Sequence, residues 1–161
     1  MRAAVGASAS TVPNGSPAAG AARGPRVSYD YAVLRVVPRP HLGAWVPVGV
    51  VVHARAADFL ALRVRADAAW VAERLAHAPG GAGGVDVELV ARYLAACEAV
   101  CRGDDAAARA GHAFALAPPS ERFHWITAPR SDVIQCSAVH SGVSAEPEAA
   151  LERLFGEYVG E

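Results

Sequence analysis

Two valine-rich runs separated by a proline-containing turn constrain the fold of this 161-residue chain more than any other feature. The first run, residues 29–37, carries β-branched or aromatic side chains on both of its faces, as in a strand that is covered on both sides. Pro38 and Pro40 end this run, because proline lacks the N–H group that a central strand donates. The run therefore predicts a strand at the centre of a sheet.

The second run, residues 46–53, indicates a neighbouring strand. Its valines at the even positions are expected on one face, because strand side chains alternate with a period of two. Gly49 on the other face predicts a bulge or the close approach of another backbone. Residues 59–65 alternate apolar side chains with Arg63 and Arg65, which indicates a third strand with one face in water. Since residues 54–58 form only a short connection, we expect an antiparallel meander.

Three helices are predicted from the residues at their ends. Asp67 and Asp86 are expected N-caps, because a carboxylate can accept hydrogen bonds from the free N–H groups of a first helical turn. The first of these helices should end at Pro79, and Gly103 should close the second. Pro147 marks the first turn of the last helix.

Residues 122–127 and 133–138 are interpreted as two further strands that form a hairpin. The complete pattern predicts an α+β fold with the element order βββααββα. It consists of a single compact domain over residues 27–161, mainly an antiparallel sheet with a three-stranded meander plus a late hairpin, and about three helices.

Residues 1–26 consist mostly of alanine, glycine, serine and proline, with too few large apolar side chains to order themselves. We expect a disordered tail, or a start site placed too far upstream. The segment also lacks the apolar stretch of a signal peptide, so no export is expected. The longest apolar run, residues 45–52, is far too short for a membrane span, so no membrane association is expected.

Cys97, Cys101 and Cys136 are an odd number of cysteines in a chain for which no export is expected. We therefore expect reduced thiols and a cytoplasmic location. Cys97 and Cys101 lie on the apolar side of a predicted helix, where core packing is favoured over metal binding. A set of His124, His140 and Cys136 matches no recognised zinc spacing, and no metal or other cofactor is predicted.

The net charge is −1, and all 15 basic residues are arginine. The lack of lysine excludes Schiff-base catalysis and a Walker-type phosphate loop. Without an overall positive field, nucleic acid is not an expected partner. Arg63 and Arg65 could form a small basic patch, although a solvated strand face explains them equally well.

Polar side chains are densest between residues 120 and 141. On the predicted strand 122–127, Arg122 and His124 would share a face. A guanidinium group can bind a phosphate or carboxylate through two parallel hydrogen bonds, and a charge inside an apolar strand must be paired or face a cavity. The candidate ligand-binding residues are Arg35, Arg122, His124, Arg130, Ser131, Gln135 and His140.

Three interpretations of these residues stay open. The arginines could form ordinary ion pairs with Glu121, Asp132 or Asp30, bind a small anionic ligand or partner, or act in catalysis. A triad of Ser131, His140 and Asp132 is disfavoured, because neighbouring strand residues point apart and no Gly-x-Ser-x-Gly turn is present.

Two functions from different classes follow. The first is a non-catalytic binding or regulatory module whose arginine-rich surface docks an anion or a partner protein. The second is a small enzyme for a phosphorylated or nucleotide substrate, with arginine clamps and a histidine as general acid or base. Geometry discriminates between them, since the enzyme needs Arg122, Arg130 and one imidazole in a single pocket.

The chain resembles the bacterial DUF3037 family from about residue 29 to residue 159. The resemblance rests on Tyr-Asp-Tyr-Ala at 29–32, Val-Gly-Val at 48–50, Ser-Glu-Arg-Phe-His-Trp at 120–125, Ala-Pro-Arg-Ser at 128–131, Ile-Gln at 134–135 and Val-His-Ser-Gly at 139–142. It places these residues in the family pattern: Arg122, Trp125, Pro129, Arg130, Ser131, Gln135, His140 and Gly142. Residues 44–47 depart from the pattern, which has an acidic residue and an asparagine there.

What the resemblance implies about function is limited, because the family is a domain of unknown function without established catalytic residues. It implies a small stand-alone protein whose partner is a kinase-like protein encoded nearby.

Overall fold

An antiparallel sheet forms the centre of the computed structural model, which describes residues 24–130 and 133–160. The strand order is β3-β2-β1-β4, and β5 also pairs with β1. The strands are β1 (Val27–Arg39), β2 (Ala44–Ala54), β3 (Phe59–Val64), β4 (Ile134–Cys136) and β5 (His140–Ser144). The helices are α1 (Ala68–Ala76), α2 (Val87–Arg102), α3 (Asp105–Arg109), α4 (Pro119–Thr127) and α5 (Pro147–Tyr158). Short 3₁₀ turns occupy η1 (Pro40–Leu42), η2 (Arg55–Ala57) and η3 (Ala113–Leu116).

The predicted α+β class and the three-stranded meander are confirmed. Residues 1–23 of the expected tail, and the candidate residue Ser131, lie outside the described residues. Among the described residues, no helix is both long enough and apolar enough to cross a membrane.

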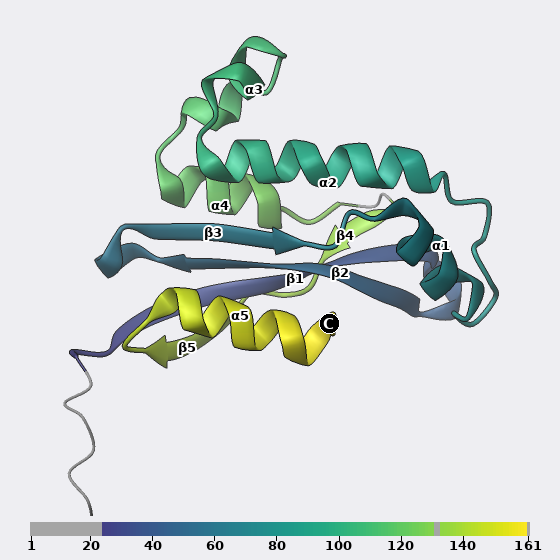
Figure 1. Cartoon of the computed structure of the whole chain (residues 1–161), viewed down its shortest axis with the longest axis horizontal. Helices are drawn as coiled ribbons and strands as arrows, with labels where there is room; N and C mark the ends of the chain where they lie inside the picture. The colour runs from purple at the N-terminus through teal and green to yellow at the C-terminus, as the bar shows by residue number, and fades with distance from the viewer. Residues whose placement is uncertain (1–23, 131–132, 161) are drawn as a thin grey trace, which may run out of the picture.

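Helices cover both faces of the sheet (Figure 1), with α2 and α4 on one side and α5 on the other. On the first side, Leu34 and Val36 of β1 belong to a core cluster with Leu94 of α2 and Phe123 of α4. On the second side, a cluster formed by β1, β2 and α5 contains Tyr29, Val33, Val50, Val52, Leu151 and Leu154. Because β1 alternates between two apolar layers, it is buried on both faces, as its sequence predicts.

A bulge beside Gly49 changes which face the second strand presents. Leu34 pairs with Gly49, but the next residue, Arg35, pairs with Pro47. Val46 and Val48 consequently lie in the α2 and α4 layer, whereas the valines at positions 50 and 52 lie in the α5 layer. The prediction of one shared face was wrong, while the predicted bulge and close approach at Gly49 are confirmed.

The predicted hairpin is wrong, because residues 122–127 belong to helix α4. Pro119 occupies the first helical turn, where its missing N–H group costs no hydrogen bond. Phe123 and Ile126, three residues apart, are both buried against the sheet. This packing overrides the strand preference of the aromatic and β-branched residues in the segment.

The last two strands pair with β1 instead of with each other. β4 lies along residues 34–36 and β5 along residues 27–31, both antiparallel to β1. Between them, Ser137 continues the ladder, since its N–H donates to the Val33 carbonyl at 2.8 Å and its Oγ accepts from the Val33 N–H at 3.0 Å. β4 and β5 therefore act as one interrupted edge strand.

The predicted caps are present in the structure. The Asp67 carboxylate accepts from the Trp70 N–H at 2.9 Å, and the Asp86 carboxylate accepts from the Leu89 N–H at 3.0 Å. Gly103 ends α2 with a left-handed φ of 72°. The following segment contains α3 and η3, which were not predicted, and projects from the body of the molecule (Figure 1).

Gly49→Ala should lower the free energy of unfolding by about 1–3 kcal/mol through overpacking. A Cβ atom at this position would lie 2.7 Å from Val64 Cγ1 and 2.8 Å from the carbonyl oxygen of Arg63. Urea denaturation measures the change. Gly156→Ala on α5 is the control: apart from its chain neighbours and the backbone of its own helix, its Cβ would have no heavy atom within 4 Å, and alanine there should stabilise by about 0.5–1 kcal/mol. Equal effects of the two substitutions would contradict the packing argument.

Candidate functional site

The sheet separates the candidate residues into two groups. Arg35 pairs with Gln135, and His140 pairs with Tyr31, so all of these lie on the α5 side of β1. Arg122, His124 and Arg130 come from α4 and the segment after it, on the other side. The imidazoles of His124 and His140 therefore do not share a pocket.

Arg122 caps the C-terminal end of α2. Its Nη1 donates to the carbonyl of Cys101 at 2.6 Å and to that of Val100 at 3.5 Å. A cation is favourable at this position, because the last carbonyls of a helix have no partner within the helix and carry partial negative charge. The guanidinium thus joins α4 to α2.

Arg130 and Arg35 each combine a carbonyl contact with an aromatic ring. Arg130 Nη2 donates to the carbonyl of Trp125 at 2.8 Å, and its guanidinium lies 4.7 Å from the centre of the Trp125 ring. Arg35 Nη2 donates to the carbonyl of Cys136 at 3.2 Å and lies 5.2 Å from the Trp45 ring centre. These are cation–π distances.

The ion pairs in the described part of the chain do not involve the candidate arginines. They join Arg63 to Glu152 and Arg153 to Glu157. Asp30, one of the expected partners, instead accepts a hydrogen bond from Ser141 Oγ at 2.6 Å. An ion pair between Asp30 and a candidate arginine, one of the open alternatives, is therefore not found among the described residues.

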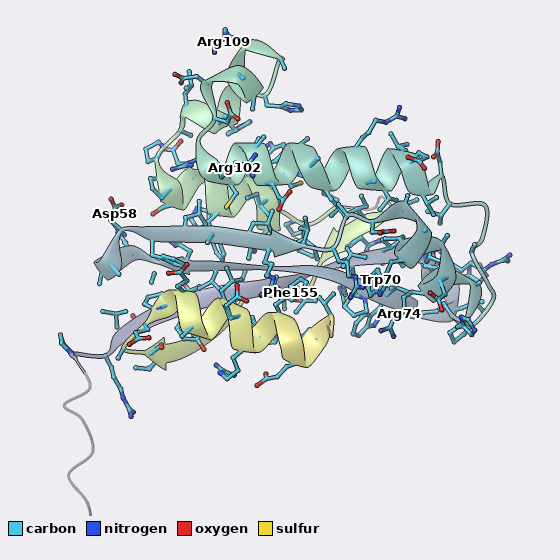
Figure 2. The ribbon with its side chains drawn as sticks, viewed as in Figure 1. Asp58, Trp70, Arg74, Arg102, Arg109 and Phe155 are labelled. Atoms are coloured by element: carbon cyan, nitrogen blue, oxygen red, sulfur yellow. The ribbon has the colours of Figure 1, made fainter. Side chains whose placement is uncertain are left out.

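A recess of about 260 Å³ opens where α1, the start of β2 and the end of α5 meet. We call it the α1–α5 recess; its wall includes Trp45, Pro47, Trp70, Arg74, His77 and Tyr158. Trp70 and Arg74 lie one turn apart on α1, so both point to the same side of the helix (Figure 2). Trp45 is 45% exposed although it is a large aromatic residue.

Stacked arginines surround the tryptophans of this recess. The guanidinium groups of Arg65 and Arg74 lie 4.7 and 5.1 Å from the centre of the Trp70 ring. Together with Arg35 on Trp45, three cations therefore contact two indoles. A guanidinium that stacks on a ring keeps its in-plane N–H groups available for a carboxylate or phosphate.

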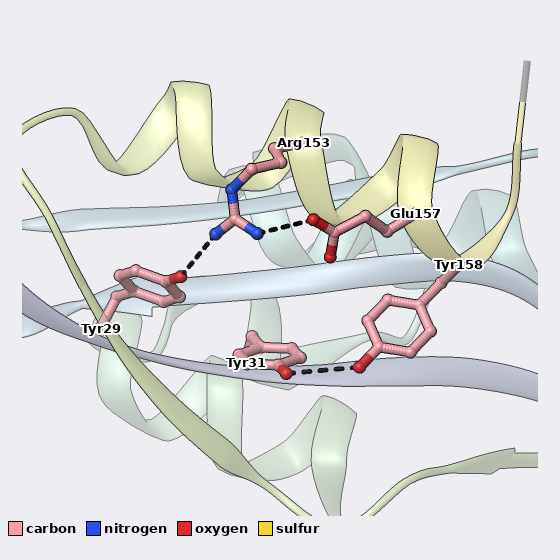
Figure 3. A network of polar contacts seen from close by, with 5 residues as sticks. All are labelled: Tyr29, Tyr31, Arg153, Glu157 and Tyr158. Atoms are coloured by element: carbon pink, nitrogen blue, oxygen red, sulfur yellow. Dashed lines mark hydrogen bonds and ion pairs between the residues drawn. The ribbon is translucent and has the colours of Figure 1, made fainter.

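A network of tyrosine contacts lies beside the part of the recess wall that belongs to α5 (Figure 3). Arg153 donates to Glu157 at 2.9 Å and to the Tyr29 hydroxyl at 3.1 Å. The hydroxyls of Tyr31 and Tyr158 are 3.4 Å apart. The hydrogen bond with Tyr158, together with burial, raises the pKa of Tyr31 to about 12, above the ordinary tyrosine value of 10.0.

On the opposite face, His53 is a buried polar side chain with 8% exposure. Its Nε2 lies 3.3 Å from Ser120 Oγ, and its ring stacks on Phe123 at 5.2 Å. Burial lowers the pKa of His53, because the interior disfavours the charged imidazolium.

Burial makes the thiols of all three cysteines weaker acids than a free cysteine. Cys97 and Cys101 are buried, as predicted, and burial raises the pKa of both thiols to about 12. Cys136 Sγ donates to the carbonyl of Ile126 at 3.2 Å, and burial raises its pKa to about 11. Within the described ranges, no group of three or more His, Cys, Asp or Glu side chains could hold a metal ion.

Sequence reasoning missed most of the recess. Trp70 was assigned to a helix, but its position relative to the start of β2 and the end of α5 depends on tertiary packing. The spacing of Trp70 and Arg74 was the available signal, since residues four apart on a helix share a face.

Arg122→Met should lower the free energy of unfolding by about 1.5–3 kcal/mol, because it removes charge-assisted hydrogen bonds from the end of α2. Chemical denaturation measures the loss. Arg92→Met, at an exposed position on the same helix, should change stability by no more than about 0.5 kcal/mol. A result in which both variants are equally stable would contradict the capping role.

His53 should make stability depend on pH. Its pKa is lower in the folded state than the ordinary value of 6.5, so the unfolded chain binds the proton more readily. The contribution of neutral His53 to the free energy of unfolding is fully present above the pKa that His53 has in the unfolded chain. It is lost as the pH falls below about 6.5. Urea denaturation at several pH values should show that His53→Gln loses less stability on acidification than the parent protein does. His41→Gln, at an exposed position, should retain the full loss, and a parent-like slope in His53→Gln would refute the assignment.

Comparison with known proteins identifies the family of this chain but no function or mechanism. A protein-family model described as "Protein of unknown function (DUF3037)" matches residues 31–159. No curated protein and no solved structure matches the chain. Since the match covers most of the sequence, the chain belongs to the DUF3037 family.

Proposed function

We propose that this protein is a cytoplasmic binding module whose α1–α5 recess, a non-catalytic site, docks an acidic segment of a partner protein. The observation that carries the proposal is the stacking of Arg35, Arg65 and Arg74 on Trp45 and Trp70. None of these guanidinium groups has a carboxylate partner among the described residues. Their charge is therefore available to a binding partner.

The size and chemistry of the recess favour a protein partner. A volume of about 260 Å³ is below the usual range for a small-molecule pocket, which begins near 300 Å³. It can accommodate one or two side chains of another protein. Tryptophan, tyrosine and arginine, all present in its wall, are the residue types that contribute most of the energy at protein interfaces. The kinase-like protein implied by the family resemblance is the partner that we propose to test first.

The alternative of an enzyme with arginine clamps has less support. Arg122 and Arg130 donate to backbone carbonyls on the α4 side, whereas Arg35 and His140 lie on the α5 side. The described candidate residues thus do not form one clamp around a phosphate.

Titration with a hexaglutamate peptide tests the recess, with the indole N–H signals of the three tryptophans observed by NMR. The signals of Trp45 and Trp70 should move, and that of Trp125 should not. Arg74→Ala should weaken binding about tenfold or more, because a charge-assisted hydrogen-bonding group is lost. Higher salt should weaken it further.

Arg109→Ala is the matched control, because this exposed arginine lies on α3, at the far end of the molecule from Arg74 (Figure 2). It should bind the peptide as the parent protein does. Equal binding by the two variants, or no signal change at millimolar peptide, would refute an acidic partner at this recess. The purified kinase-like protein can then be titrated with the same variants.

A further inference from the structure

A row of polar side chains crosses the sheet on the α2 and α4 side. His53 of β2 pairs with Asp30 of β1, and Asp30 pairs with Ser141 of β5. Residues that are paired directly across antiparallel strands share a face, so these three side chains are neighbours. Ser120, from the first turn of α4, lies above the row and contacts His53.

The contacts give each member of the row a defined neighbour. Ser120 Oγ is 3.3 Å from His53 Nε2, and Ser141 Oγ donates to Asp30 Oδ1 at 2.6 Å. The Phe123 ring stacks on His53 and restricts its rotation. Asp30 and His53 are not hydrogen-bonded to each other in the described structure, so the carboxylate acts on the ring through its charge.

His53 is suited to accept a proton from Ser120. Burial is the main influence on the imidazole, and it favours the neutral form that can act as a base. Asp30 and Asp58 favour the protonated ring, whereas His124 and Arg55 oppose it. The nearby carboxylate of Asp30 can therefore stabilise the imidazolium once it has formed.

Solvent reaches the Ser120 hydroxyl and several of the residues around it. Ser120 is partly exposed, and Asp30, Ser141 and His124 are exposed. His124 lies one turn after Ser120 on the same side of α4. The sheet is therefore open to solvent at this end of the row.

We propose that Ser120 is the nucleophile of an acyl-transfer site for small carboxylic esters, with His53 as its general base and Asp30 as the nearby charge that stabilises the imidazolium. A hydroxyl in contact with a neutral imidazole is the pair of groups that activates a serine as a nucleophile. It was not predicted from the sequence, because its members lie 23 to 90 positions apart and meet only through the strand register.

In the first step, Ser120 Oγ forms a bond to the ester carbonyl carbon while its proton passes to His53 Nε2. The bond from that carbon to the alcohol oxygen then breaks, and the alcohol leaves with the proton from His53. In the second step, water attacks the acyl-serine, giving up its proton to His53. The carboxylic acid is released and the proton returns to Ser120, so the only co-reactant is water.

This site is independent of the proposed partner-binding function, because the α1–α5 recess lies elsewhere and contains none of these residues. Either proposal can fail while the other stands.

An alkyl fluorophosphonate tests the proposal on the intact chain. It should label Ser120, forming an oxygen–phosphorus bond with loss of fluoride, and mass spectrometry should locate the adduct on that residue. Ser120→Ala should abolish labelling. His53→Gln, whose amide can keep the contact with Ser120 but cannot act as a base, should slow it on the order of 100-fold.

Ser28→Ala is the control, because Ser28 is an exposed serine on the same face of β1. It should label at the parental rate, and circular dichroism should show that all variants are folded. Hydrolysis of p-nitrophenyl acetate should decrease in Ser120→Ala and His53→Gln but not in Ser28→Ala. Absence of labelling in the parent protein, an adduct on another residue, or an unchanged rate in folded His53→Gln would each overturn the proposal.

Discussion

The double burial of β1 is the constraint on which the rest of the structure depends. This strand pairs with β2 along one edge and with β4 and β5 along the other. Its side chains enter two separate apolar clusters, one with α2 and α4 and one with α5. Because a strand alternates strictly, each residue of β1 is committed to one layer. The polar residues within it are consequently held in fixed positions on opposite sides of the molecule.

The two proposed sites follow from this alternation. Asp30 lies in the polar row beneath α4, whereas Arg35 lies on the α5 side and stacks on Trp45. The bulge at Gly49 also matters, because it reverses the side on which the start of β2 presents its residues. Without that reversal, Trp45 would face the α2 layer and the recess would lose one of its two indoles.

The features that the sequence predicted correctly are those set by local chemistry. The meander follows from the valine runs and short turns, and Asp67 and Asp86 cap helices because a carboxylate satisfies N–H groups within its own first turn. Gly49 was recognised because only a missing side chain permits so close an approach.

Features that depend on distant contacts were not accessible in this way. α4 contains residues with a strand preference, and its helical form rests on burying Phe123 and Ile126 against the sheet. Once that segment is a helix, Arg122 reaches the end of α2 instead of a shared surface with Arg130. Likewise, Ser120 meets His53 across 67 positions of sequence.

The one-residue step between Asp30 and Tyr31 has a consequence for how this chain can vary. The side chains of these two neighbours lie on opposite faces of the sheet. Asp30 is hydrogen-bonded to Ser141, and Tyr31 is hydrogen-bonded to Tyr158. Removing or adding one codon at this point would exchange the two layers for every residue on one side of the change. We therefore expect β1 to vary by substitution alone, and we expect changes of length to be better tolerated in the projecting arm that contains α3, which is not part of the sheet.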